Sequence, residues 1–348
     1  MRGMRGALAL AVAAGLSTGC THWMPGTPTP EPAARAEVTI DDYGLDLALR
    51  ERADLRTAAV LRTIDPCGLV SRTELGKYGR VVQVVPHGGP HRCQVLVLSG
   101  AGDSQRLLIE LGDRKPDAPA DYAVDGGVVL RAPNARGTDC ALVVPMKLPA
   151  AGIGGLGGET FTTYTSVTAH AFDGDNCLPA ATVAAKVLAA AEHLKLPLRG
   201  YAANRLPGGG NDPCALAGHL PAGWRVGRFI TLSAPYDCTF YAKAADNKDH
   251  YFTIRLEIGK ADVTSSLADP IDLGGRPGTL YCPPHTSPEV PENCFADFAL
   301  DGTLDGNVAD SPLRGLELSY GKVRTVVSVY GIRAVVQEFA TAATALYR

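Results

Sequence analysis

The sequence lacks the features by which most enzymes are recognised. Aromatic residues make up 6% and charged residues 20% of the 348 residues. Outside residues 15–19, which match Gly-x-Ser-x-Gly within the N-terminal apolar run, no Gly-x-Ser-x-Gly, His-Glu-x-x-His, Walker-type or Cys-x-x-Cys motif occurs. Without them, no nucleophile elbow, zinc-binding helix, phosphate loop or dithiol couple can be assigned, and we expect no catalytic residue, metal ligand or bound cofactor.

An excess of positive charge is also lacking. The formal net charge is −3, and the chain without its first nineteen residues loses only Arg2 and Arg5 from its basic residues. This balance argues against nucleic-acid binding and against electrostatic adhesion to anionic lipid. What the sequence does contain is 46% hydrophobic residues, enough for packed cores, over a length that favours two domains.

The N-terminus has the pattern of an exported chain. Arg2 and Arg5 precede an apolar run over residues 7–16, which is too short to span a bilayer. The following Ser17-Thr18-Gly19-Cys20 resembles the lipobox of bacterial lipoproteins, although leucine is more usual at the position of Ser17. We therefore predict a signal peptide over 1–19 and a lipid anchor on Cys20, in place of ordinary cleavage beside an incidental cysteine.

The segment after Cys20 is rich in proline and poor in residues that pack into a core. It is typical of an extended spacer. We interpret residues 20–55 as a tether that holds the folded part away from the membrane surface, with partial helix in its last third.

Eight further cysteines remain, an even number that indicates disulfide bonds in an exported chain. They are Cys67, Cys93, Cys140, Cys177, Cys214, Cys238, Cys282 and Cys294.

The cysteines fall into two similar sets of four. Asp-Pro-Cys occurs at Cys67 and again at Cys214, and the second cysteine follows after 26 and 24 residues. The third follows after 47 and 44 residues, whereas the fourth follows after 37 and 12. These spacings indicate a duplication in which only the fourth cysteine has moved, with copies over 56–200 and 201–348.

Eight cysteines can pair in 105 ways, or in nine if each copy pairs within itself. A fourth cysteine moves most easily if it pairs with the third and leaves the first pair intact. The expected bridges are Cys67–Cys93, Cys140–Cys177, Cys214–Cys238 and Cys282–Cys294.

Each copy shows the same order of elements. Asp65-Pro66 and Asp212-Pro213 are typical helix starts, and Ser71 with Glu74 forms a capping-box pattern. Strands and then a closing helix follow, at 178–194 in the first copy and from 332 in the second. The expected strands are 80–85, 93–98, 106–111, 127–130, 140–148, 165–172, 225–230, 238–243, 251–258, 294–300, 316–320 and 323–330. We predict an α+β fold of two tandem disulfide-bonded domains, each an antiparallel sheet with helices packed on one face.

The doubled Asp-Pro-Cys-x-Leu motif, the later strand cysteine and the lipobox resemble a family of actinobacterial lipoproteins known as a domain of unknown function. The resemblance covers both copies and is weaker in the second, where residues 217–221 interrupt the first helix. It implies an envelope location and a secreted α+β module. It brings no catalytic residues to transfer.

Three segments resemble ligand sites, and each has a plainer interpretation. His87 and His91 near Cys93 suggest metal ligands, but a turn between strands is favoured. The run 173–177 begins like a calcium loop without its later glycine and glutamate, so a helix cap is favoured. The glycine-rich run 152–158 precedes a threonine-rich strand and not a helix, which favours a flexible connection over a phosphate loop.

Two hypotheses for function follow. The first is a lipid-anchored binding or interaction module on the extracytoplasmic face of the membrane, with an envelope ligand or protein as partner. The second is an envelope enzyme without a recognisable motif, such as a hydrolase. If the copies pack together, we expect their mutual interface to shape the site, because ligand pockets favour such interfaces; alternatively, the second copy only braces the first.

Overall fold

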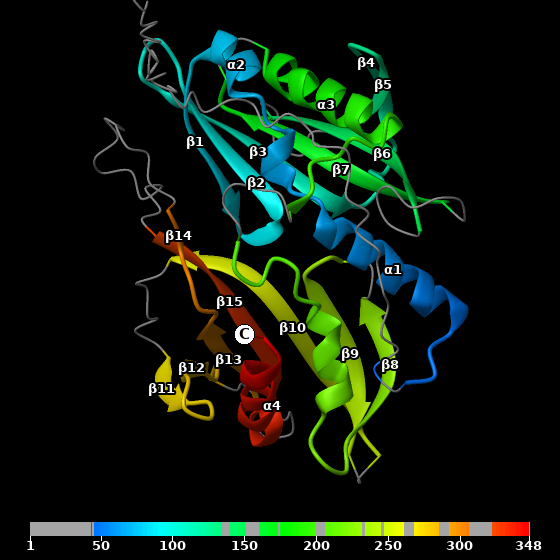
Figure 1. The fold of residues 1–348 in the computed structure, drawn as a ribbon, viewed down its shortest axis with the longest axis vertical. Helices are drawn as coiled ribbons and strands as arrows, with labels where there is room; N and C mark the ends of the chain where they lie inside the picture. Colours follow the sequence, from blue (N-terminus) through cyan, green and yellow to red (C-terminus); the bar gives the residue numbers. More distant parts are fainter. Residues whose placement is uncertain are drawn as a thin grey trace, which may run out of the picture. The chain divides into compact units, whose positions relative to one another are not determined.

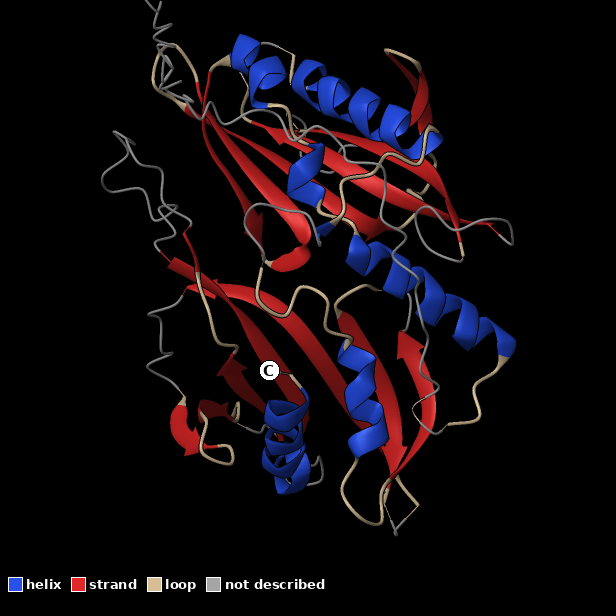
Figure 2. Ribbon diagram, in the orientation of Figure 1, coloured by secondary structure: helices blue, strands red, loops and turns tan. Residues whose placement is uncertain are grey.

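The computed structural model describes residue 43 and residues 45–133, 139–150, 160–172, 175–199, 206–231, 234–244, 247–260, 268–284, 292–305 and 322–347. These residues form two antiparallel β-sheets with a few helices (Figures 1 and 2). The predicted α+β class holds only in part, because strands dominate and one long helix packs on each sheet. No helix in the described ranges is long and apolar enough to cross a membrane.

The first sheet has seven strands in the order β1-β2-β3-β7-β6-β5-β4. Four short or medium helices precede it, and α3 (Cys177–Glu192) follows it and packs on β6 and β7. The preceding helices are α1 (Leu49–Thr63), η1 (Pro66–Leu69), α2 (Arg72–Leu75) and η2 (Gly76–Tyr78). The strands are β1 (Arg80–His87), β2 (Gly89–Leu98), β3 (Ser104–Asp113), β4 (Ala120–Val124), β5 (Gly127–Arg131), β6 (Cys140–Pro149) and β7 (Thr160–His170).

The second sheet has eight strands, of which seven follow the path β8-β9-β10-β15-β13-β12-β11 and β14 pairs with β15. The 3-10 helix η4 (Pro213–His219) precedes it, and α4 (Arg333–Leu346) follows it and packs on β13 and β15. The strands are β8 (Arg225–Thr231), β9 (Asp237–Lys243), β10 (Asp249–Lys260), β11 (Asp269–Asp272), β12 (Pro277–Tyr281), β13 (Asn293–Ala299), β14 (Leu304–Asp305) and β15 (Lys322–Ile332).

The two sheets have the same connectivity, strand for strand. The first three strands β1, β2 and β3 correspond to β8, β9 and β10. The other strands of the first sheet, β7, β6, β5 and β4, correspond in turn to β15, β13, β12 and β11. In both, the closing helix comes directly after the last central strand. Most expected strands are present; β4, β11, β12 and β14 were not predicted, and the predicted strand 316–320 lies outside the described residues.

The helix starts agree with the sequence. The Asp65 carboxylate accepts a hydrogen bond from the Cys67 amide at 3.1 Å, and Asp212 does the same for Cys214 at 2.9 Å. The hydroxyl of Ser71 accepts from the Glu74 amide at 3.3 Å. These caps satisfy backbone donors that no helical carbonyl reaches.

Four disulfides form, and their pairing agrees with the one expected from the spacing. They join Cys67 to Cys93, Cys140 to Cys177, Cys214 to Cys238 and Cys282 to Cys294.

The structure corrects which cysteine has moved between the copies. Cys140 lies on β6 opposite Ala169 of β7, and Cys294 lies at the equivalent place on β13 opposite Gly331 of β15. Cys294 is therefore the counterpart of Cys140. The displaced residue is its partner, which is Cys177 at the start of α3 in the first sheet and Cys282 just after β12 in the second. The order of the cysteines along the chain hid this difference. The displaced cysteine follows its partner in the first copy, where Cys177 comes after Cys140, and precedes it in the second, where Cys282 comes before Cys294.

The folded part begins earlier than the expected end of the tether at residue 55. Leu47 and Leu55 are buried in the core of the second sheet, whereas Val60 and Leu61 are buried in the core of the first. The helix α1 thus packs against both sheets on different sides. Its apolar residues make no single stripe for this reason, which is why its sequence pattern is mixed.

Candidate functional site between the two sheets

The turn between β1 and β2 brings the first sheet against the second. Gly88 occupies the left-handed region at φ +72° at the tip of this hairpin, and its carbonyl accepts a hydrogen bond from the Ile258 amide of β10 at 3.4 Å. A side chain other than glycine is disfavoured there. The expected turn between two strands is therefore present but is confined to Gly88, because His87 belongs to β1 and His91 to β2. The turn also makes a contact between the sheets.

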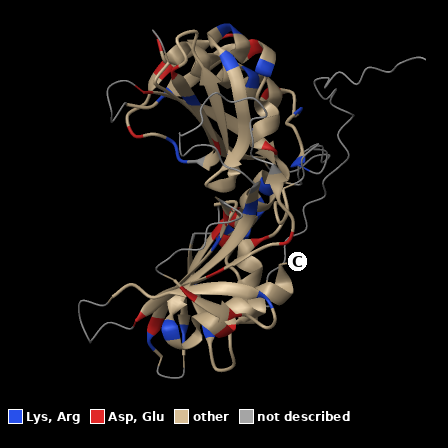
Figure 3. Ribbon diagram, turned by 90° about the vertical axis from the view of Figure 1, so that its left-hand side faces the viewer, with Lys and Arg blue, Asp and Glu red and all other residues tan. Residues whose placement is uncertain are grey.

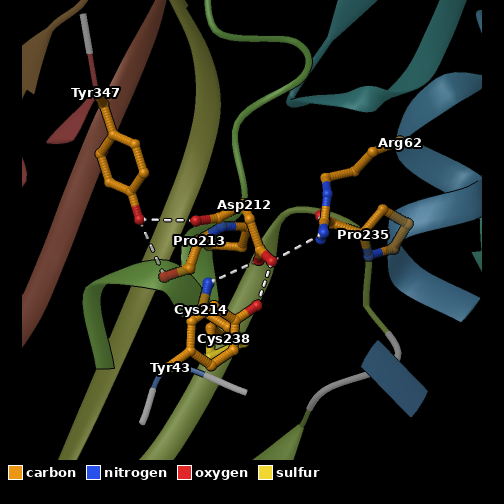
Figure 4. A network of polar contacts seen from close by, with 8 residues as sticks. All are labelled: Tyr43, Arg62, Asp212, Pro213, Cys214, Pro235, Cys238 and Tyr347. Atoms are coloured by element: carbon orange, nitrogen blue, oxygen red, sulfur yellow. Dashed lines mark hydrogen bonds and ion pairs between the residues drawn. A yellow bond between two sulfur atoms is a disulfide. The ribbon is translucent and has the colours of Figure 1, made fainter. Parts of the chain in front are cut away.

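Arg62, near the end of α1, links the two halves through charge (Figure 4). Its guanidinium lies 3.0 Å from the Asp212 carboxylate and donates to the Pro235 carbonyl at 3.1 Å. Tyr43 donates a hydrogen bond to the same carboxylate, and the Tyr347 hydroxyl donates to the Asp212 carbonyl at 2.9 Å. Burial, followed by the nearby Asp212 charge, raises the pKa of Tyr347, so this hydroxyl stays a neutral donor.

A second buried arginine fixes the backbone around the site. Arg199 donates to three carbonyls, those of Arg62, Ile64 and Pro90, at 3.3, 3.0 and 2.8 Å. Each of these bonds joins residues more than a hundred positions apart in the chain. A guanidinium with several carbonyl partners holds segments that no secondary structure connects.

Tyr236, just before β9, is held from several sides. Its hydroxyl donates to the carbonyls of Gly209 and Arg62, and the Arg199 guanidinium lies 5.8 Å from its ring centroid. The His91 ring stacks on it with a centroid distance of 5.8 Å. Burial raises the pKa of Tyr236, which keeps the phenol protonated.

A pocket with a volume of about 350 Å³ lies beside this junction, in the size range of small-ligand sites. The charged and polar residues that line it come from β2 and β3 of the first sheet and from β9 and β10 of the second. Figure 3 shows basic and acidic residues gathered between the two sheets. The lining consists of Gly88, His91, Arg92, Glu110, Leu111, Gly112, Ala234, Pro235, Tyr236, Asp237, Arg255, Leu256 and Glu257.

Glu110 is the acidic group on the first-sheet wall. Arg92 lies directly opposite it in the β2–β3 ladder, with its guanidinium 2.7 Å from the carboxylate, and the His91 Nε2 lies at 3.6 Å. Burial acts to raise the pKa of Glu110, but the hydrogen bonds from His91 and Arg92 outweigh it and leave the pKa below its usual value. Glu110 is therefore an ionised group at neutral pH.

Asp237, Arg255 and Glu257 form the second-sheet wall. Arg255 pairs with Asp237 across the β9–β10 ladder at 2.8 Å. Burial raises the pKa of Asp237 despite this pair, and burial followed by repulsion from Asp297 and Asp237 raises the pKa of Glu257. The second-sheet wall thus favours a partner that supplies positive charge or hydrogen-bond donors.

Two buried polar nitrogen atoms in the pocket are not used within the described part of the chain. The Nε of Arg92 and the Nδ1 of His91 are shielded from solvent and have no hydrogen-bond partner there. Leaving such atoms unpaired costs about 1–3 kcal/mol each. A polar ligand in the pocket would satisfy them, so the site offers both donors and acceptors to an occupant.

The segments that resembled ligand sites have mostly structural roles. Cys93 is oxidised, and of the two histidines only His91 lines the pocket. The Asp175 carboxylate accepts from the Cys177 amide at 2.8 Å, which is the helix cap favoured from the sequence, although residues 173 and 174 lie outside the described residues. Cys20 and residues 152–158 also lie outside them.

Cys282, Glu292 and Cys294 come together in the spacing of a metal site. Both sulfur atoms belong to the same disulfide, and a disulfide sulfur is not the thiolate that binds metal ions. We therefore interpret this cluster as structural.

Sequence reasoning missed most of the pocket: Arg92, Glu110, Asp237, Arg255 and Glu257. Only one signal pointed to it, the alternation along β10 that set Arg255 and Glu257 on a face away from the core. The end of that face around Glu257 is where the second sheet meets the first. No protein-family model, curated protein or solved structure matches the chain.

Proposed function

We propose that this protein is a lipid-anchored binding protein of the bacterial envelope, made of two tandem copies of one α+β unit, whose ligand site is the pocket between the sheets. The pocket carries the proposal: both copies contribute charged groups to it, and it contains buried nitrogen atoms of His91 and Arg92 without partners in the described part of the chain. The identical strand order supports the duplication. Four disulfides suit an oxidising compartment, which agrees with export and with an anchor on Cys20.

Photo-crosslinking in intact cells tests the site. A photoreactive amino acid at Glu257 lies in the pocket, and one at Ala189, an exposed position of α3, serves as the matched control. Irradiation should yield an adduct of defined mass at 257 and none at 189. Equal labelling at both positions, or none at either, would contradict a ligand in the pocket.

Fractionation of cells tests the anchor. Replacing Cys20 by alanine should move the protein from the membrane fraction to the soluble one and abolish labelling by a radioactive fatty acid. A protein that stays in the membrane fraction and keeps its label contradicts the assignment.

Hydrolysis is a second candidate, favoured by one observation. Asp237 and Glu257 lie in the same pocket on paired strands, both with raised pKa. Both side chains lie on one face of the neighbouring strands β9 and β10, and a pair of carboxyl groups is what most glycosidases use as acid and base or nucleophile. Release of reducing ends from isolated envelope polysaccharide that is lost in Glu257→Gln would support it, and no release by the unaltered protein would exclude it.

A further inference from the structure

The second sheet has one face under α4 and one face on its opposite side. On β10, Phe252, Ile254 and Leu256 belong to the core, and Phe252 contacts Phe339 of α4. The alternate residues, Thr253 and Arg255 among them, lie on the opposite face because neighbouring side chains of a strand point to opposite sides. We call this second surface the open face.

A row of aromatic rings crosses the open face. The rings come from five neighbouring strands, β9, β10, β15, β13 and β12, and successive centroids are 5.7, 5.9, 4.7 and 6.4 Å apart. They are half-buried, apart from Tyr251, which is 40% exposed. Since neighbouring strands lie about 4.8 Å apart, the row extends over about 19 Å. We call it the aromatic band; it consists of Tyr241, Tyr251, Tyr330, Phe295 and Tyr281.

A polar row runs in register beside the aromatic band. Arg255 pairs with Asp237 on one side and with Ser328 on the other, and Ser328 pairs in turn with Asp297. Asp297 keeps one carboxylate oxygen without a hydrogen-bond partner in the described part of the chain. Asp237 and Arg255 also line the pocket, so the polar row begins there. Hydrogen-bonding groups therefore lie alongside aromatic rings over the width of four strands.

The chemistry of this surface selects one class of ligand. The register places four acidic residues on this face, Asp237, Asp249, Glu257 and Asp297, against five basic ones, Arg225, Arg228, Lys243, Arg255 and Arg324. The charges nearly cancel, which gives neither a polyanion nor a polycation a strong net attraction. Aromatic rings present a flat apolar surface. Carboxylates accept hydrogen bonds from hydroxyl groups, and guanidinium groups donate hydrogen bonds to them. Sugars have apolar C–H faces and hydroxyl edges. A neutral sugar chain thus matches both rows at once.

We propose that the open face binds a neutral polysaccharide, which stacks on the aromatic band while its hydroxyl groups pair with the polar row that leads into the pocket. This rests on the proposed function, because it names the class of ligand that the pocket and its extension take. Aromatic residues make up only 6% of the sequence, so five rings in contact on one face are a marked concentration.

Retardation of the full chain in native gels tests the proposal. Gels would contain glycogen, laminarin or a plant galactan as neutral polymers, or dextran sulfate as the polyanion. At least one neutral polymer should slow the protein, and the apparent affinity should fall at least tenfold in Tyr251→Ala and further in Tyr251→Ala/Tyr330→Ala. Tyr330→Phe keeps the ring and should stay within about threefold. Tyr122→Ala, on β4 of the first sheet, is the matched control and should bind as the unaltered chain does.

Several results would overturn the proposal: retardation by dextran sulfate alone, equal retardation of all variants, or none in any neutral polymer. Self-association that Tyr251→Ala abolishes would instead make the open face an interface between two copies. Circular dichroism of each variant separates loss of binding from loss of folding, and Tyr330→Phe gives a reading if the alanine variants unfold. Crosslinking at 257 without retardation by neutral polymers leaves the pocket as a site and removes the polysaccharide.

Discussion

At the scale of single residues, Arg62 is a buried side chain that holds the two sheets together. It is 7% exposed, and its ion pair with Asp212 and its bond to Pro235 both reach the second half of the chain. Arg333 forms an ion pair of similar length with Glu292, but both side chains are exposed by more than a third. The two pairs allow a direct comparison of a shielded and a solvated ion pair.

Replacing Arg62 by methionine should lower the free energy of unfolding by about 2–3 kcal/mol, because Asp212 and the Pro235 carbonyl lose a shielded donor. Arg333→Ala, as the control, should cost no more than about 0.5–1 kcal/mol. Chemical denaturation measures both. The double variant Arg62→Met/Asp212→Asn should lose less than the two single losses added together; simple additivity would show that the two residues do not interact.

Two carboxyl groups, Glu110 of the pocket and Asp297 of the open face, should respond to pH in opposite directions. The pKa of Glu110 is lowered, so its stabilisation is complete above its unfolded pKa and is lost as the pH falls through the folded one. Burial raises the pKa of Asp297, so its charge opposes folding at neutral pH, and this penalty disappears as the pH falls through its folded pKa.

We therefore expect Glu110→Gln to lower stability at pH 7 by about 1–2 kcal/mol and Asp297→Asn to raise it. Both differences from the unaltered chain should shrink towards zero on acidification, once the native carboxyl groups are protonated. Thermal melts from pH 3 to 8 measure this. A stabilising effect of Asp297→Asn that is constant over the whole range would mean that charge is not its cause.

At the scale of elements, the two closing helices are held in different ways. The helix α3 begins at Cys177, which is bonded to Cys140 of β6. The helix α4 carries no cysteine, and its attachment is the packing of buried residues such as Val336 and Phe339. In the first sheet, the bridge Cys140–Cys177 thus attaches the closing helix to a strand. In the second sheet, the bridge Cys282–Cys294 attaches the end of β12 to β13 instead.

Removing the two bridges should consequently have unequal local effects. Cys140→Ala/Cys177→Ala should accelerate amide hydrogen exchange in α3, with a loss of stability of about 2–4 kcal/mol. The Cys282–Cys294 bridge closes a shorter loop and does not involve α4. Its removal in Cys282→Ala/Cys294→Ala should leave exchange in α4 little changed. Hydrogen exchange followed by mass spectrometry compares the helices. Equal acceleration in both would show that the bridges act on the whole chain and not on the attached element.

At the scale of the whole molecule, α1 connects two cores. It provides Leu55 to the second core and Leu61 to the first, and Arg62 at its end joins the junction network. The two sheets share a repeated topology, but they do not divide the chain into two independent segments at residue 200. The N-terminal part of the folded chain belongs to both.

A fragment of residues 206–348 should therefore be less stable than the second half of the intact chain, because Leu47 and Leu55 no longer cover its core. Burying one leucine contributes about 1.5–3 kcal/mol. Adding a fragment of residues 43–200 should restore a cooperative melt. A fragment 206–348 that melts by itself at the temperature of the full chain would show that α1 is dispensable for the second sheet.

The sequence by itself determined the local features of this protein. The helix caps at Asp65, Ser71 and Asp212 depend on neighbouring residues, and the central strands depend on period-two alternation. The disulfide pairing was predicted from the spacing of the cysteines in the two copies. The sequence displays all of these features directly. The same local evidence predicts the lipid anchor on Cys20.

Only the tertiary structure decided the rest. Glu110 and Arg255 are 145 positions apart, and no pattern along the chain states that the hairpin tip at Gly88 docks on β10 to bring them to one pocket. The short strands such as β4 and β11 escaped prediction because they carry few buried residues. The counterpart of Cys140 became clear only from its place in the sheet. Side chains from distant strands meet because the sheets pack and pair, and the sequence order does not record that arrangement.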